Sequence, residues 1–324
     1  MIKLNQALAA CVAAAATLMP MIAAADEYPS KPIRLIVAYG AGSGADTIAR
    51  ILAEHLQGAL KGSVVVDNRP GAGGAIGTQS VARAPADGYT LILAPTTLTV
   101  SPHMQATPAY DAVKDFAPIM RVAILPMTVV TAADAPFKTL PELVAQAKAR
   151  PGQLNYATSG KGSPSHLEVE LLRKHFGIQV RDVPYRTGSQ ALTDLISGQV
   201  SFYFPVLPAA LPQMESGRLR ALAVGTPDRS PKAPDVPTLA ELMHKPGYEA
   251  SVWYGLLAPA GTPPAVIDRL HRATAQVLES PQLRQAVNST GSEVSPMPPE
   301  QFTTFIREEN TKWGALVKEL NLQE

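Results

Sequence analysis

The sequence predicts an α/β protein that folds as two lobes. Its 324 residues are too many for one ordinary domain, since domains of about 100–150 residues are the commonest. Short apolar runs of strand length alternate with longer segments whose apolar residues recur at helical spacing. The 30 prolines and 23 glycines fall singly at the ends of these segments, where they indicate turns and not low-complexity tracts.

The first strand and helix are predicted within residues 33–56. Residues 33–37 form an apolar run of strand length, which the small-residue segment 39–46 interrupts. Ile48, Ile51 and Leu52 then begin a helical pattern, so we expect a helix that packs one face on the sheet. The loop therefore leads into a helix N-terminus, where unpaired backbone N–H groups carry partial positive charge and attract anions.

Three interpretations of this loop remain open from the residues alone. Residues 40–45 (GAGSGA) fit the fingerprint G-x-G-x-x-G/A, and Asp67 ends the next apolar run, as in a dinucleotide-binding dehydrogenase. Asp46, however, lies in the first helical turn, where its carboxylate can cap exposed N–H groups and would repel a pyrophosphate. A small carboxylate ligand is the second interpretation, and a tight turn without a ligand is the third.

Residues 1–25 have the pattern of a secretory signal peptide. Lys3 precedes an alanine-rich apolar stretch, and residues 23–25 (AAA) fit the A-x-A cleavage site. We therefore predict export to the periplasm with cleavage after Ala25. A lipoprotein box at Cys11 would leave an apolar region shorter than signal peptides use. Cys11 is the only cysteine, so the mature chain can form neither a disulfide nor a cysteine-ligated metal site.

Charge and histidine spacing argue against several classes of protein. The net charge is +1, so no basic field favours nucleic acid. The six histidines include no H-E-x-x-H or similar pair, and we predict no metal site. His166 is the best candidate for a catalytic base, but neither Ser43 nor Ser163 lies in a nucleophile motif. We predict a helix-terminal packing role for His166, no catalysis and no cofactor.

Eight segments, in order along the mature chain, carry a family resemblance. They are residues 28–34 (YPSKPIR), 68–74 (NRPGAGG), 87–91 (DGYTL), 151–156 (PGQLNY), 162–167 (GSPSHL), 192–195 (LTDL), 198–200 (GQV) and 255–263 (GLLAPAGTP). Together they resemble the solute-binding proteins of tripartite tricarboxylate transporters, the Bug family. The resemblance covers essentially the whole mature chain.

The resemblance implies a periplasmic receptor with the two-lobed Venus flytrap architecture of periplasmic binding proteins and crossing hinge strands. We place the first lobe at residues 26–124 and 250–324 and the second at residues 125–249. The implied solute is a small carboxylate, and the implied partners are the membrane subunits of a tripartite tricarboxylate-type transporter. We expect the receptor itself to be a monomer. A sensory receptor with the same lobes is an alternative that the sequence does not separate from transport.

In this family two strand-to-helix loops, one per lobe, hold a carboxylate mainly through backbone N–H groups and bridging waters. By position these loops are residues 39–46 and 186–189, and Thr96 and Thr97 follow another strand that ends at the same edge of the sheet. The candidate ligand-binding residues are Tyr39, Ala41, Gly42, Ser43, Asp46, Thr96, Thr97, Ser159, Lys161, Ser163, His166, Arg186, Thr187, Gly188, Ser189, Phe204 and Trp253.

The chain departs from the family pattern at positions that bear on the far end of the solute. Lys161 stands where a neutral residue is usual, and Pro205 stands where an acidic one is common. A gained cation and a lost acid favour a second anionic group, while the aromatic run that ends at Phe204 favours a ring. We therefore expect a dicarboxylate, such as an aromatic one. The alternatives are a solvated Lys161 and core packing for Phe204 and Trp253.

Overall fold

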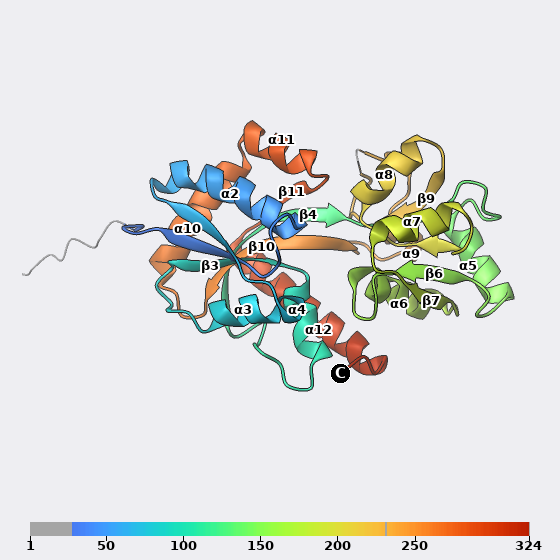
Figure 1. Cartoon of the computed structure of the whole chain (residues 1–324), viewed down its shortest axis with the longest axis horizontal. Coiled ribbons are helices and arrows are strands. Elements are labelled where there is room, and N and C mark those ends of the chain that lie inside the picture. The colour runs from blue at the N-terminus through green and yellow to red at the C-terminus, as the bar shows by residue number, and fades with distance from the viewer. Residues whose placement is uncertain (1–27, 231, 324) are drawn as a thin grey trace, which may run out of the picture.

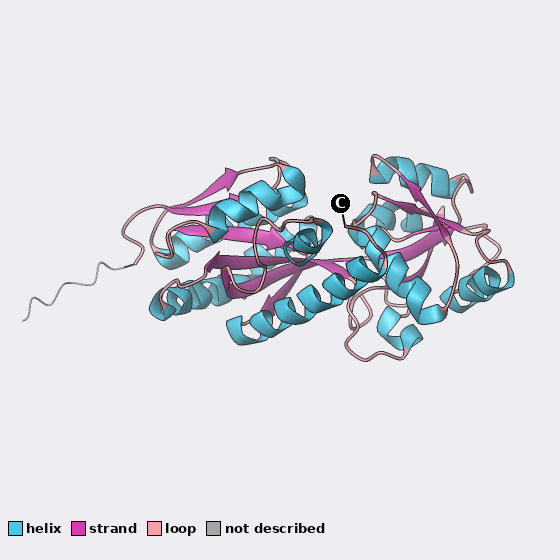
Figure 2. Ribbon diagram, turned by 90° about the horizontal axis from the view of Figure 1, so that it is seen from below, coloured by secondary structure: helices cyan, strands magenta, loops and turns pink. Residues whose placement is uncertain are grey.

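The computed structural model describes residues 28–230 and 232–323, which form two lobes joined by long strands (Figure 1). The predicted signal peptide lies outside the described residues. Lobe 1 has a six-stranded sheet of order β11-β4-β10-β3-β1-β2, and lobe 2 has a five-stranded sheet of order β7-β6-β8-β5-β9. Helices surround both sheets (Figure 2). The predicted two-lobed α/β fold is confirmed.

Lobe 1 is built from the first and last parts of the chain. Its elements are β1 (Ile33–Val37), α2 (Gly44–Leu60), β2 (Val64–Asn68), the 3-10 turn η1 (Ala72–Gly74), α3 (Ala75–Ala82), β3 (Thr90–Pro95), α4 (Thr97–Met104), β4 (Phe116–Pro126), β10 (Ser251–Pro259), α10 (Pro264–Leu278), α11 (Pro281–Ser289), β11 (Glu293–Met297) and α12 (Pro299–Glu319). Strand β1 pairs in parallel with β2 and β3, and β10 runs antiparallel to β3 and β4.

Lobe 2 is the middle of the chain. Its elements are β5 (Thr128–Ala132), α5 (Leu140–Ala149), β6 (Asn155–Thr158), α6 (Pro164–Phe176), β7 (Arg181–Pro184), α7 (Gly188–Ile196), β8 (Phe202–Tyr203), α8 (Leu207–Glu215), β9 (Leu219–Val224) and α9 (Leu239–Met243). Strand β6 lies parallel to β7 and β8, so the loops that follow β6 and β7 emerge at the same edge of the sheet.

Each sheet is covered on both faces, which explains the near-continuous apolar runs of its central strands. In β1, Leu35 packs towards α2 and α10, whereas Ile36 packs towards α3 and α12. Both side chains are fully buried. The alternation of side chains along a strand therefore supplies two cores in lobe 1 from one five-residue segment.

The two lobes are joined by the long strand pair β4 and β10. Three backbone hydrogen bonds form where these strands enter lobe 2. The amide of Met127 donates to the Ala250 carbonyl at 3.2 Å, Gly225 donates to the Met127 carbonyl at 2.8 Å, and Ala250 donates to the Gly225 carbonyl at 2.7 Å. A Cβ atom on Gly225 would lie 2.0 Å from the Ala250 oxygen, so only glycine fits there. The hinge is thus held by the backbone itself.

The C-terminal helix α12 makes another link between the lobes. Figure 2 shows this long helix running beneath lobe 1 towards lobe 2. Trp313 and Val317 near its end share an apolar cluster with Val100 of α4 and Leu167 of α6. Lobe 2 therefore rests against α12 as well as on the hinge strands. Within the described residues, no helix is long and apolar enough to cross a membrane.

Glu168 of α6 is a buried carboxyl group at this contact between the lobes. It is 3% exposed, and it accepts a hydrogen bond of 2.7 Å from the hydroxyl of Tyr248. Burial raises its pKa to about 7, although Lys312 of α12 and the Tyr248 hydrogen bond act in the opposite direction. Glu309 and Glu249 also face it and favour the neutral form. The carboxyl group is therefore partly protonated at neutral pH.

This burial predicts a pH-dependent stability that Glu168→Gln should remove. The folded pKa of about 7 exceeds the ordinary value of 4.5, so the stabilisation is complete below pH 4.5 and is lost as the pH rises through 7. The glutamine keeps an acceptor for Tyr248 but cannot ionise. Between pH 5 and pH 8 the stability of the variant relative to wild type should rise by roughly 2–3 kcal/mol. Urea unfolding at both pH values measures it, and a constant difference would contradict the prediction.

Candidate functional site

The carboxylate of Asp46 closes the loop between β1 and α2. It accepts hydrogen bonds from the Gly42 amide at 2.8 Å, from Asn68 Nδ2 at 2.9 Å and from Arg50 Nε at 3.0 Å. Burial opposes ionisation, but these donors outweigh it and hold the pKa of Asp46 below its usual range. The carboxylate therefore fixes the loop before α2, whereas Ser43 Oγ caps the helix by accepting from the Asp46 amide. Since Asp46 uses the Gly42 amide, the donors left for a ligand are the first-turn amides of α2, beginning with Gly44.

Tyr39 and Thr97 lie together beside this loop. The Tyr39 hydroxyl is 2.6 Å from Thr97 Oγ1 and donates to the Gly73 carbonyl at 3.1 Å, and burial raises its pKa. Thr96 points elsewhere, because its Oγ1 accepts a 2.9 Å hydrogen bond from the Trp253 amide of β10. The two neighbouring threonines therefore make different contacts. Thr97 borders the loop, whereas Thr96 binds the crossing strand β10.

The loop between β6 and α6 in lobe 2 repeats the backbone geometry of the first loop. Gly42 and Gly162 have φ values of +81° and +73°, and the N-cap residues Ser43 and Ser163 both have a φ of −69°. Each serine amide donates, at 3.2 Å, to the carbonyl of the glycine three residues before it. The same turn thus leads from strand to helix in both lobes.

His166 occupies in this second turn the position that Asp46 has in the first. Its Nδ1 accepts from the Gly162 amide at 3.4 Å, and its own amide donates to Ser163 Oγ at 3.3 Å. The side chain is 6% exposed, and burial lowers its pKa. The neutral ring therefore caps a loop, which is the packing role that the sequence favoured over catalysis.

The three helices that begin at these sheet edges differ in their first residue. Helix α2 begins at Gly44 and α7 at Gly188, whereas α6 begins at Pro164. Proline has no backbone N–H, so α6 lacks the first donor that an anion at its N-terminus would use. The amides of α2 and α7 are therefore the better pair for an anionic group.

The turn before α7 presents small polar side chains around Gly188. Thr187 Oγ1 caps the helix by accepting from the Gln190 amide at 3.3 Å, and it lies 3.1 Å from Ser189 Oγ. A Cβ atom on Gly188 would lie 3.6 Å from the Tyr203 hydroxyl, so the helix N-terminus lies directly against that ring. Arg186 is exposed and lines, with Tyr185 and Ser189, a separate open cavity.

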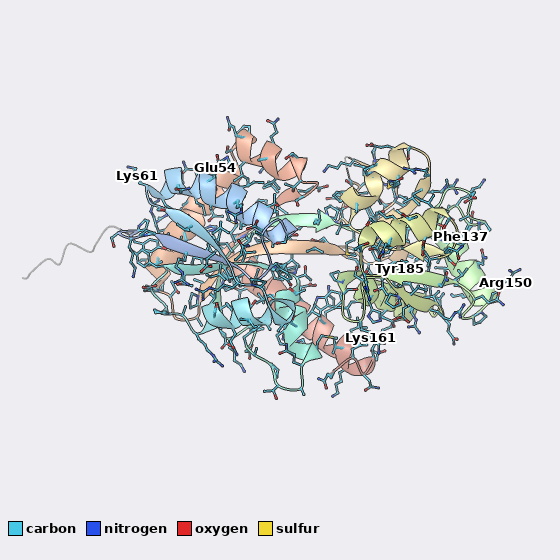
Figure 3. All side chains as sticks on the ribbon, viewed as in Figure 1. Glu54, Lys61, Phe137, Arg150, Lys161 and Tyr185 are labelled. Carbon is cyan, nitrogen blue, oxygen red and sulfur yellow. The ribbon has the colours of Figure 1, made fainter. Side chains whose placement is uncertain are left out.

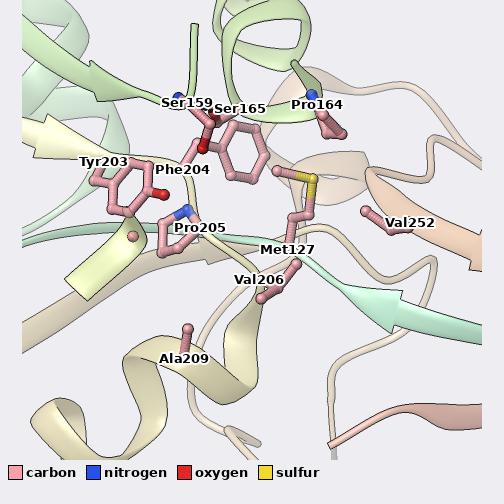
Figure 4. A pocket seen from close by; sticks show the side chains of 11 residues that line it. Met127, Ser159, Pro164, Ser165, Tyr203, Phe204, Pro205, Val206, Ala209 and Val252 are labelled. Carbon is pink, nitrogen blue, oxygen red and sulfur yellow. Dashed lines mark hydrogen bonds between the residues drawn. The ribbon is translucent and has the colours of Figure 1, made fainter. Parts of the chain in front are cut away.

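A cavity of about 240 Å³ lies beside this turn (Figure 4). Its wall combines the lobe 2 loops with the strands that cross between the lobes. The residues that line it are Met127, Ser159, Pro164, Ser165, Gly188, Tyr203, Phe204, Pro205, Val206, Ala209 and Val252. Of the residues proposed from the sequence, Ser159, Gly188 and Phe204 are among them. None of these eleven residues carries a charge.

Sequence reasoning missed most of this wall. Tyr203 lies inside the aromatic run 202–204, and the alternation of side chains along a strand could have placed it opposite its neighbours. Met127 and Val252 are apolar residues within crossing strands, with nothing local to separate them from core residues. Ala209 is exposed on the first turn of α8 and carries no polar group.

Of the seventeen residues proposed as ligand contacts, fourteen do not line this cavity, and Trp253 and Lys161 are two of these. Trp253 is fully buried, with its ring 5.6 Å from that of Phe302 and 5.9 Å from that of Phe305, so it is part of the lobe 1 core. This burial favours the alternative of core packing for Trp253. Lys161 is exposed, and Figure 3 shows it at the edge of lobe 2.

The geometry also weakens the dinucleotide interpretation. Asp67, the acid that would bind a ribose, is 3.1 Å from Arg69 Nε and 3.5 Å from an Arg34 guanidinium nitrogen. Asp46 holds the Gly42 amide that a pyrophosphate would use, and its charge would repel the phosphates. Among the described residues, no group of three His, Cys, Asp or Glu side chains is arranged to hold a metal ion.

Comparison with known proteins agrees with this geometry. A sequence model described as "Tripartite tricarboxylate transporter family receptor" matches residues 48–322. The chain belongs to this receptor family. Protein BugT of Bordetella pertussis is 38% identical over 297 residues, which cover 91% of each chain. A relative from Cupriavidus necator is 35% identical over 314 residues and covers 97% of this chain and 95% of its own.

Solved structures of receptors in this family have the same fold. A ligand-free solute-binding protein from Polaromonas is 30% identical with a TM-score of 0.83, and it covers 90% of this chain and 99% of its own. MatC from Rhodopseudomonas palustris with bound malate is 29% identical with a TM-score of 0.70, at 90% and 100% coverage. A second R. palustris protein, with adipate, is 32% identical with a TM-score of 0.72, at 90% and 97% coverage.

The capping role of His166 predicts a loss of stability in acid that His166→Asn should reduce. Because the folded pKa is lowered, the stabilisation is complete above the unfolded value of about 6.5 and is lost as the pH falls below it. Asparagine offers an uncharged acceptor to Gly162. Between pH 7.5 and pH 5, the Tm of this variant should therefore fall less than that of wild type.

The groups facing His166 are Glu170, Asp182, Arg173 and Lys161, and they remain in this variant. His55→Asn, on α2 and away from this loop, is the matched control and should follow wild type. An equal fall for His166→Asn and wild type would show that the ring does not act through its protonation.

Proposed function

We propose that the mature chain is a periplasmic receptor that binds a small carboxylate between its lobes and delivers it to the membrane subunits of a tripartite tricarboxylate-type transporter. The observation that carries the proposal is the pair of glycine-initiated helices, α2 in lobe 1 and α7 in lobe 2, at the sides of the lobes that face each other. Figure 1 shows the starting end of α2 directed at lobe 2, and Figure 3 shows Tyr185, just before α7, on the side of lobe 2 that faces lobe 1.

This arrangement suits a carboxylate because its donors are fixed and uncharged. First-turn amides bind an anion without a cation in the site, so no ion pair has to be broken when the solute leaves. Donors from two lobes converge only when the lobes approach, and they separate when the lobes open. Binding and release would then follow the hinge between β4 and β5 and along β10.

The relatives support the ligand class. Two related structures hold malate and adipate, which are carboxylates.

Export and partners rest on separate observations. The signal-peptide pattern of residues 1–25 favours the periplasm, and the description of the family names the transporter class. The proposal includes a monomer that acts without a cofactor or catalytic step.

The two features of the expected aromatic dicarboxylate, its ring and its second carboxylate, have different support. A ring is favoured by the apolar cavity next to Gly188 and Tyr203. A second carboxylate rests on Lys161, which is exposed and outside the cavity lining. Which of these two features the solute has therefore depends on the chemical groups that the cavity accommodates.

The carboxylate cradle can be tested by removing a single backbone donor. Gly188→Pro deletes the first amide of α7 at a position where proline suits a helix, and Thr187, with φ −135° and ψ 146°, has the extended conformation that a residue before proline needs. We expect loss of one charge-assisted hydrogen bond, worth about 1.5–3 kcal/mol, and so carboxylate binding weaker by a factor of about 10 or more, measured by calorimetry.

Gly188→Ala is the matched control, because it adds a Cβ in ordinary contact with Tyr203 but keeps the amide. It should bind carboxylates nearly as wild type does. Equal affinities for Gly188→Pro and Gly188→Ala would show that this amide does not bind the solute.

A further inference from the structure

The cavity beside α7 has one polar end. At that end lie Gly188 and the hydroxyl groups of Ser159, Ser165 and Tyr203, whereas the remaining wall is formed by aliphatic, aromatic and proline side chains. Figure 4 shows Phe204 and Met127 side by side across this wall, with Val206 and Val252 beyond them. A solute held by the α7 amide would therefore extend its remaining atoms over an apolar surface.

The polar groups at this end are suited to a single carboxylate. Ser165 Oγ accepts the Ser159 amide at 3.2 Å and lies 3.1 Å from Ser163 Oγ, so its hydrogen bonds are largely made within the protein. Burial raises the pKa of Tyr203, which keeps its hydroxyl protonated. The Tyr203 hydroxyl is thus a neutral donor next to the helix N-terminus, where a carboxylate oxygen would accept it.

The apolar part of the wall excludes a second charge. A carboxylate there would meet no cation and no side-chain amide among the lining residues, and an ion buried without a partner is strongly unfavourable. Pro205 contributes neither a charge nor an N–H group to this surface. Lys161 and Arg186 are both exposed and do not line the cavity.

The size of the cavity sets the size of the group that fills it. An apolar cavity of about 150 Å³ binds benzene in another protein. At about 240 Å³, the present one has room for a six-membered ring or a branched chain of similar bulk. A linear two-carbon acid would leave most of the apolar wall in contact with water.

We propose that the solute is a monocarboxylic acid whose apolar ring or branched chain fills the cavity formed by Met127, Phe204, Pro205, Val206, Ala209 and Val252. This inference rests on the proposed receptor function and replaces the expected second carboxylate with an apolar group. Removal of that group from water supplies the selectivity, while the α7 amides supply the requirement for one carboxylate.

The test compares acids that share a carboxylate but differ in the rest of the molecule. Mature protein, residues 26–324, is titrated by calorimetry with phenylacetate, 4-methylpentanoate, acetate, malate and adipate. We expect the first two to bind at least about tenfold tighter than the other three, because several additional apolar carbons are buried. Their heat-capacity change on binding should also be more negative than that of acetate.

Ala209→Phe tests the cavity directly, since Ala209 is exposed on α8 and a larger side chain there does not disturb the core. The new ring occupies the cavity and should weaken phenylacetate and 4-methylpentanoate by about tenfold or more relative to acetate. Ala149→Phe, on the exposed face at the end of α5 in the same lobe, is the matched control and should retain the wild-type order of affinities.

The outcomes separate this inference from the receptor function itself. Tighter binding of malate or adipate, weakened by Lys161→Ala, would overturn the apolar solute and restore the dicarboxylate while leaving the receptor function intact. An unchanged affinity order in Ala209→Phe would also overturn it. If none of the five acids bound, the receptor function would fail together with this inference.

Discussion

Unpaired amides at the start of a helix are the physical constraint on which the binding region depends. The first N–H groups of any helix have no carbonyl in the preceding turn, and each must find another acceptor. In this protein the strand-to-helix loops meet that need in two ways. Ser43 Oγ and Ser163 Oγ accept hydrogen bonds from the amides of Asp46 and His166, and Pro164 removes one donor altogether. The amides that remain, at Gly44 and Gly188, are then available to a solute.

The turn that both lobes share shows that one backbone conformation can accommodate different side chains at the position after the N-cap serine's turn, Asp46 in lobe 1 and His166 in lobe 2. The glycine, serine and helix-start geometry is nearly the same at Gly42–Ser43 and at Gly162–Ser163. An acid at the capping position binds Arg50 and Asn68 as well, so it fixes the loop to neighbouring elements. The histidine at the same position makes no corresponding hydrogen bonds to neighbouring elements within the described residues. Because its pKa is lowered, the stability of the loop should instead fall in acid.

The sequence was informative where local chemistry decides the structure. The segment from β1 to α2 was predictable because an apolar run, a glycine-rich turn and a helical pattern follow one another, and α12 because its apolar residues recur at helical spacing. Helices α4 and α8 are weakly marked in the sequence, since each has a proline inside it, Pro102 or Pro212. Strand β11 is weakly marked too, because Glu293–Met297 is short, partly exposed and contains a proline.

The site residues divide along the same line. Loop positions such as Gly188 follow from their place between a strand and a helix. The direction of Trp253 does not, because β10 is covered on both faces and its alternation fits either assignment. Met127 and Val252 join the cavity only because distant strands meet at the hinge, which no short stretch of sequence records.

The two lobes contribute differently to the proposed site, because the residues that line the cavity come from only part of the chain. All eleven lining residues come from lobe 2 or from the crossing strands, and none comes from α2 or the loop before it. Met127 and Val252 are held in place by the backbone hydrogen bonds around Gly225, which tie the crossing strands to β9. The volume of the cavity is therefore set by lobe 2 and the hinge segments, without a contribution from α2 or the loop before it. In the proposed receptor lobe 1 contributes amides to the carboxylate, so shape selection and carboxylate binding by lobe 1 depend on different residues and can be altered separately.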